Sequence, residues 1–152
     1  MIRSRSGDPH GCVIDIQGDE LLWRRGFLFF NGEGPGSVLE GVTIQNGYGY
    51  EGSAIWCWGA SPTISHVILR RHTAVLNGAA IFCGGNSSPT IRNVTFVGNS
   101  ASQGAAVHAA SNSSPVMERC VIAFNRGGGA IGTRYRFTAA ISTGISGGTG
   151  PG

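Results

Sequence analysis

A six-residue motif recurs at a fixed distance along the chain. Gly-Ser-Ala-Ile-Trp-Cys at 52–57, Gly-Ala-Ala-Ile-Phe-Cys at 78–83 and Gly-Ala-Ala-Val-His-Ala at 104–109 are each 26 residues apart. A second motif lies between these copies with spacings of 27 and 26 residues, as Ser-Pro-Thr-Ile at 61–64 and 88–91 and Ser-Pro-Val-Met at 114–117. A period in the twenties is typical of stacked supersecondary units that bury their apolar faces against one another.

Each period contains three short apolar runs, bounded by Gly, Asn, Ser or Pro, and the runs are too short for helices. Two of them keep apolar residues at equivalent positions in every coil: Leu39, Ile64, Ile91 and Met117 in the first run, and Val42/Ile44, Val67/Leu69, Val94/Phe96 and Cys120/Ile122 in the second. Strands that pair with their equivalents in the next coil form parallel sheets with continuous interior columns. The repeat therefore predicts an all-β parallel solenoid, with the glycines at 52, 78 and 104 at tight corners.

The third run predicts a candidate binding face. Period-two alternation sends Ile55/Cys57, Ile81/Cys83 and Val107/Ala109 inward and sends Trp56, Phe82 and His108 outward. Together with Trp58, these outward rings are the predicted ligand-binding residues, because flat aromatic faces stack on sugars or other rings. The alternative is that the rings only stabilise neighbouring strands as cross-strand pairs.

The amino-acid sequence of the repeat resembles that of a known family. The segment Asn-Ser-Ser-Pro-Thr-Ile-Arg-Asn-Val-Thr-Phe-Val-Gly-Asn at 86–99, with Gly-Ala-Ala-Val at 104–107, is similar to the repeats of the pectin-lyase-like superfamily, especially the Gly-rich repeats of polymorphic outer-membrane proteins. The resemblance covers residues 37–131 and implies a right-handed parallel β-helix of four to five coils of 25–27 residues. The chain departs from the pattern at Ala79-Ala80 and Ala105-Ala106, and at Arg71-His72, where the family has glycines and asparagine.

These patterns divide the chain. Residues 1–131 are expected to form one β-helix domain, with a degenerate first coil over 10–36 and regular coils over 37–131, and residues 132–152 an irregular or flexible tail. Among the four cysteines, Cys57 and Cys83 share one inward column and Cys120 lies in the valine column. We expect them to be small buried apolar groups, with a Cys57–Cys83 disulfide as the alternative.

The acidic residues do not predict an active site. In the related superfamily, lyases hold calcium with carboxylates and hydrolases pair carboxylates as acid and base, but residues 52–131 contain no aspartate and a single glutamate, Glu118. We interpret Asp15, Asp19 and Glu20 as a solvated turn without partners from neighbouring coils. The sequence therefore predicts no catalytic residue, no metal site and no cofactor.

Two function classes remain. The first is a non-catalytic extracellular or cell-surface module, a spacer or adhesin-like segment that meets a polysaccharide or cell-surface glycan. The second is a truncated carbohydrate-active enzyme, a polysaccharide lyase or glycoside hydrolase whose catalytic coils lie outside this chain.

The eleven arginines are scattered and no nucleic-acid motif occurs. No apolar run reaches the length of a membrane helix, and the first residues lack the apolar segment of a signal peptide, so a surface location would come through a longer parent protein. Uncapped coil ends predict end-to-end self-association.

Overall fold

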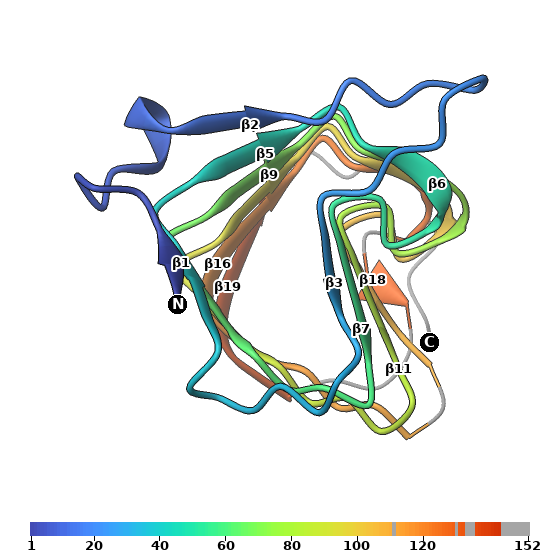
Figure 1. Ribbon diagram of the computed structural model, residues 1–152. Helices are drawn as coiled ribbons and strands as arrows, with labels where there is room; N and C mark the ends of the chain where they lie inside the picture. The colour runs from blue at the N-terminus through green and yellow to red at the C-terminus, as the bar shows by residue number, and fades with distance from the viewer. Residues whose placement is uncertain (111, 130, 133–135, 144–152) are drawn as a thin grey trace.

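The backbone winds in about four turns, each lying on the one before (Figure 1). This computed structural model describes residues 1–110, 112–129, 131–132 and 136–143. Within them, the secondary structure is strands and one 3₁₀ helix, η1 (Pro9–Gly11), which lies before strand β2. The fold is the all-β parallel solenoid that the repeat predicts.

The strands follow one another in the same order in each coil. The first coil contributes β1 (Ile2–Arg3), β2 (Val13–Asp15) and β3 (Phe27–Phe29). The next three coils contribute β4 (Val38–Glu40), β5 (Thr43–Gln45), β6 (Tyr48–Glu51) and β7 (Ile55–Trp58); β8 (Thr63–Ser65), β9 (Ile68–Arg70), β10 (Thr73–Asn77) and β11 (Ile81–Gly84); and β12 (Thr90–Arg92), β13 (Thr95–Val97), β14 (Ser100–Gln103) and β15 (Val107–Ala109). The remaining strands are β16 (Val116–Ala123), β17 (Arg126–Gly128), β18 (Ile131–Gly132) and β19 (Arg136–Thr143).

The strands assemble into three parallel sheets. The largest contains two ladders, β1-β4-β8-β12 and β2-β5-β9-β13, which both end on the long strand β16, and β19 pairs with β16 as well. The second sheet has the order β17-β14-β10-β6 and the third has the order β18-β15-β11-β7-β3. Each strand therefore pairs with its own equivalent in the neighbouring coil.

The second sheet corrects the sequence interpretation, which predicted three strand runs per coil and not four. Strands β6, β10, β14 and β17 carry no recurring column of large apolar residues, and their register shifts at several points. Their interior is a small separate cluster made only of alanines: Ala74, Ala79, Ala101 and Ala105. Because alanine is neither β-branched nor large, this strand has almost no sequence signal.

The interior columns are confirmed. Leu39, Ile64, Ile91 and Met117 are in register and fully buried, and so are Ile55, Ile81 and Val107. In the second run, Val121 pairs with Thr95 and is 37% exposed, so it points away from the interior column. Cys57 and Cys83 lie side by side in their inward column, fully buried, as free thiols. The hydrogen bond between the two thiols, followed by burial, raises the pKa of Cys83.

The corners require glycine for a specific steric reason. At Gly52 the backbone φ is 56°, in the left-handed region, and a Cβ placed there would lie 2.6 Å from the carbonyl oxygen of Ile55 and 3.0 Å from Cβ of Phe82. Gly78 and Gly104 have φ values of 58° and 57° in the equivalent positions. The three glycines thus fold the end of the second sheet closely against the third.

Two predicted boundaries differ from the structure. Strand β1 pairs with β4 in register, Ile2 with Leu39, so the first coil begins before residue 10. Strand β19 pairs with β16, so residues 136–143 are not the irregular tail predicted for 132–152. Both strands join the sheet through backbone hydrogen bonds, which do not require the residues of the repeated motifs. Gly132, the first residue of the predicted tail, lies on β18, and the rest of the tail, 133–135 and 144–152, lies outside the described residues.

Candidate ligand-binding face

The predicted ligand-binding residues lie on the outer face of the third sheet. Trp56, Phe82 and His108 are register partners on β7, β11 and β15, as the alternation predicts. Their exposure differs from the prediction: Trp56 is half-buried, whereas Phe82 and His108 are only 3% and 7% exposed. The prediction that each coil presents one accessible ring is therefore wrong for these two coils.

The corner glycines contribute to this burial. Cβ positions built on Gly52 and Gly104 lie 3.0 Å and 2.9 Å from the Cβ atoms of Phe82 and His108, so the corner backbone lies directly against the base of each ring. The rings of Phe82 and His108 stack on each other with centroids 5.8 Å apart and planes 5° apart. Burial lowers the pKa of His108, partly offset by the charge of Glu51, and its Nδ1 has no hydrogen-bond partner among the residues that the structure describes. These two rings form a packed pair.

Trp58 is the accessible ring of the predicted set. It is 47% exposed and stacks on Trp56, with centroids 5.7 Å apart and planes 10° apart. Its ring lies over the backbone of the next coil, where Cβ atoms on Gly84 and Gly85 would come within 2.6 Å and 2.9 Å of it. The two glycines therefore leave room for the indole to lie flat.

The first coil extends this surface. Leu28 on β3 pairs in register with Trp56 and is 47% exposed, and Phe30 directly follows β3 and is 56% exposed. The Arg25 guanidinium lies 5.6 Å from the Trp56 ring centroid, within cation–π distance. It donates from Nη2 to the carbonyl oxygen of Glu51 at 2.6 Å and from Nε to that of Gly52 at 2.9 Å.

We call Leu28, Phe30, Trp56 and Trp58 the aromatic platform. Sequence reasoning missed its first-coil members because they lie outside the strict repeat. The run Gly-Phe-Leu-Phe-Phe at 26–30 was the signal, since it matches the glycine-then-strand order of the third run. Chemically, the platform offers a flat apolar surface with a fixed cation at its border. Such a surface suits a ligand with a flat apolar face and polar edges.

Comparison with known proteins identifies the family. Residues 15–138 match the family model described as a right handed beta helix region. The chain belongs to this family. The match covers the regular coils and most of the first, and it agrees with the stacked parallel sheets. None of the curated proteins and none of the solved structures compared with the chain matches it.

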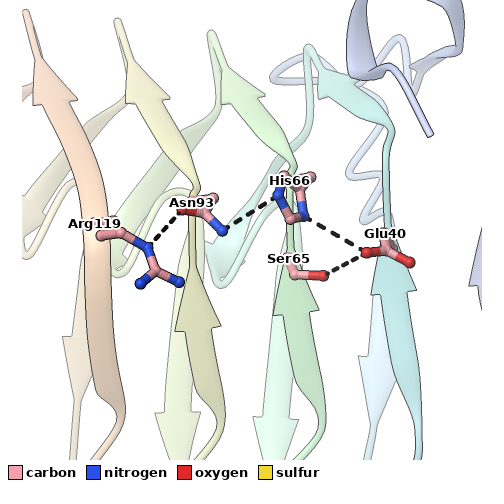
Figure 2. A network of polar contacts seen from close by, with 5 residues as sticks. All are labelled: Glu40, Ser65, His66, Asn93 and Arg119. Atoms are coloured by element: carbon pink, nitrogen blue, oxygen red, sulfur yellow. Dashed lines mark hydrogen bonds and ion pairs between the residues drawn. The ribbon is translucent and has the colours of Figure 1, made fainter.

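A second cluster of polar residues lies on this right-handed β-helix, at the corner between β4 and β5 and its equivalents. Its side chains follow one another from coil to coil (Figure 2). Ser65 Oγ donates to Glu40 Oε1 at 3.2 Å, and His66 Nδ1 lies 3.5 Å from the same oxygen. Further along, His66 Nε2 lies 3.2 Å from Asn93 Nδ2, and Arg119 Nε donates to Asn93 Oδ1 at 3.0 Å. We call these residues the exposed ladder. The sequence interpretation missed it, although a polar residue or glycine recurs at this position in each coil.

The exposed ladder has the properties of a structural network. His66, Asn93 and Arg119 all adopt positive φ, between 50° and 53°, so one corner conformation brings their side chains into line. The His66 side chain is 52% exposed, and its interactions are therefore screened by water. Among the described residues, no group of three or more histidine, cysteine or acidic side chains could hold a metal ion. Nor is any described helix long and apolar enough to cross a membrane.

The acids of the first coil also differ from the interpretation as a solvated turn without partners. Asp15 accepts hydrogen bonds from Gln45 Nε2 and Asn46 Nδ2 of the next coil, both at 2.9 Å. The hydrogen bond from Asn46, followed by that from Gln45, lowers the pKa of Asp15. Asp19 closes a local turn, since its Oδ1 accepts from the backbone nitrogens of Leu21 and Leu22. Asp15 thus joins two coils, and Asp19 holds an exposed loop.

Proposed function

We propose that this chain is a non-catalytic extracellular or cell-surface β-helix module that binds a polysaccharide or cell-surface glycan on the aromatic platform. The observation that carries the proposal is the Trp56–Trp58 pair, a stacked pair of indoles of which Trp58 is 47% exposed. Trp58 is held flat over Gly84 and Gly85, so little side-chain entropy is lost when a ligand docks. The extracellular setting is supported by the resemblance of the repeats to those of outer-membrane proteins.

The shape of the platform favours a sugar ligand over a small enclosed molecule. Sugar rings have apolar C–H faces that stack on indoles, and their hydroxyl groups remain at the border, in water. The platform lies on the outside of a sheet, which suits a chain that passes across several coils. Arg25 beside Trp56 adds a positive charge that would favour glycans with carboxylate groups.

The test is a binding measurement on neutral and acidic polysaccharides with the chain, Trp58→Ala and Trp23→Ala. Trp23 is a matched control because it is also a stacked tryptophan and is 56% exposed. It lies on the loop before β3 and stacks on Tyr50, outside the aromatic platform. We expect Trp58→Ala to bind at least about tenfold more weakly, a loss of about 1.4 kcal/mol, and Trp23→Ala to bind as the parent does.

Circular dichroism should show both variants folded, which separates lost binding from lost structure. Equal binding by the parent and Trp58→Ala, or no binding by the parent, would overturn the proposal. The same samples are assayed for cleaved polysaccharide, because release of product would instead support the truncated-enzyme alternative.

A further inference from the structure

A buried polar ladder runs through the stack at the corner that follows β5, β9 and β13. Its positions are Gly47, His72, Asn99 and Asn125 in successive coils. Each side chain accepts from the backbone N–H one coil before: His72 Nδ1 from Gly47 at 3.0 Å, Asn99 Oδ1 from His72 at 3.0 Å, and Asn125 Oδ1 from Asn99 at 2.9 Å. All three side chains are at most 3% exposed.

Each side chain also donates to the preceding coil. Asn99 Nδ2 donates to the carbonyl oxygen of Leu69 at 3.1 Å, and Asn125 Nδ2 donates to that of Phe96 at 3.0 Å. His72 Nε2 lies 3.0 Å from the carbonyl oxygen of Ile44, in the same relation. The histidine therefore repeats the two hydrogen bonds that the asparagines make with their amide groups.

The geometry allows one protonation state of His72. Nδ1 faces an N–H group and must be unprotonated, whereas Nε2 faces a carbonyl oxygen and must carry the proton. A charged imidazole has donors on both nitrogens and no acceptor, so it cannot receive the Gly47 N–H. The amide groups of Asn99 and Asn125 keep both functions at every pH.

Gly47 is fitted to the imidazole. A Cβ at this position would lie 2.8 Å from His72 Nδ1 and would also clash with the carbonyl oxygen of Ser53. Glycine leaves no side chain that could move in to replace the lost acceptor. The Gly47 N–H therefore relies on His72 Nδ1 as its acceptor, although backbone bonds from Asn46 to Arg70 and from Thr73 to Gly47 also join the two coils here.

Within the described part of the chain, no charged side chain is hydrogen-bonded to the His72 ring, so none compensates a proton on it. The groups that meet the ring, Ile44 and Gly47, are uncharged. On the flanking strands, Arg70 donates to Gln45, Arg25 donates to the backbone of Glu51 and Gly52, and the Glu51 carboxylate accepts from Asn77. Arg71 lies at the exposed left-handed corner.

We propose that His72 is an acid-sensitive joint, at which protonation releases the Gly47 corner while the Asn99 and Asn125 joints hold. The direction of the effect follows from burial, which lowers the pKa of His72 from 6.5 to about 4, slightly offset by the Ile44 carbonyl. Because the folded-state pKa lies below the unfolded one, the unfolded chain binds the proton more readily between these values. The stability that depends on neutral His72 is complete above pH 6.5 and is lost as the pH falls towards 4.

The first experiment measures unfolding by urea between pH 7 and pH 5 for the chain, His72→Asn and His10→Asn. We expect that protonation of His72 lowers the folding equilibrium constant about 20-fold between pH 7 and pH 5, in addition to any change caused by the other titratable groups. In His72→Asn this excess should disappear, because an amide can make both hydrogen bonds. His10→Asn should keep the parent's pH dependence, since His10 is exposed. An unchanged pH dependence in His72→Asn would overturn the proposal.

The second experiment needs no variant that might fail to fold. Nitrogen NMR of the histidines should show His72 as the neutral tautomer with the proton on Nε2, titrating well below the ordinary histidine pKa of 6.5. Hydrogen-exchange protection of the Gly47 amide should fall with acid before that of the Asn99 amide. Titration of His72 near 6.5, or simultaneous loss of the two protections, would contradict the acid-sensitive joint.

Discussion

The buried ladder and the exposed ladder contain similar residues at two corners of each coil, yet they differ in how strongly they stabilise the stack. Each contains a histidine and at least one asparagine that bond from coil to coil. In the buried ladder most bonds satisfy a backbone group that water cannot reach, and one more joins the side chains of Asn99 and Asn125, whereas in the exposed ladder water competes for the His66 side chain, which is 52% exposed. The comparison teaches that burial, and not residue type, decides how strongly a polar column stabilises the stack.

The largest effect should come from Asn99→Ala. This change leaves the buried N–H of His72 without its acceptor, removes the donor that Asn99 Nδ2 offers to the carbonyl oxygen of Leu69, and leaves Asn125 Oδ1 with one bond fewer. We expect the free energy of unfolding to fall by about 2–4 kcal/mol, since each unsatisfied buried group costs about 1–3 kcal/mol. Urea denaturation at neutral pH measures it, and a loss below about 1 kcal/mol would show that the buried ladder is dispensable.

A smaller effect is expected from Glu40→Gln in the exposed ladder. The substitution removes the charge that faces His66 but keeps an oxygen for Ser65. The free energy of unfolding should change by less than about 1 kcal/mol, and the difference should shrink in about 1 M salt because screening is then nearly complete. A larger, salt-independent loss would mean that Glu40 behaves as a buried group.

The smallest effect should be that of Asn93→Gly. Glycine accepts the left-handed backbone at this corner, where φ is 53°, so the variant removes only the side-chain bonds to His66 and Arg119. We expect a change within about 0.5 kcal/mol in the same denaturation experiment, typical of exposed sites. A loss as large as that of Asn99→Ala would end the distinction between the ladders.

The aromatic platform shows where sequence reasoning reached its limit. Alternation placed Trp56, Phe82 and His108 correctly on one outer face. It could not show that the corner backbone lies against Phe82 and His108, because the strands of the second sheet have no recurring column of large apolar residues. The same limit hid Leu28 and Phe30, whose register with the repeat depends on a first coil with insertions.

The sequence by itself determined the period, the interior columns, the parity of the strands and the glycine corners, because each of these repeats every 25 to 27 residues. Only the tertiary structure decided which outward rings are covered, that 136–143 adds a strand, and that the His72 corner belongs to a buried hydrogen-bonded ladder. The physical reason is that these features depend on contacts between coils. The residue type sets the chemistry of a side chain, but the residues above and below it in neighbouring coils decide whether water can reach it.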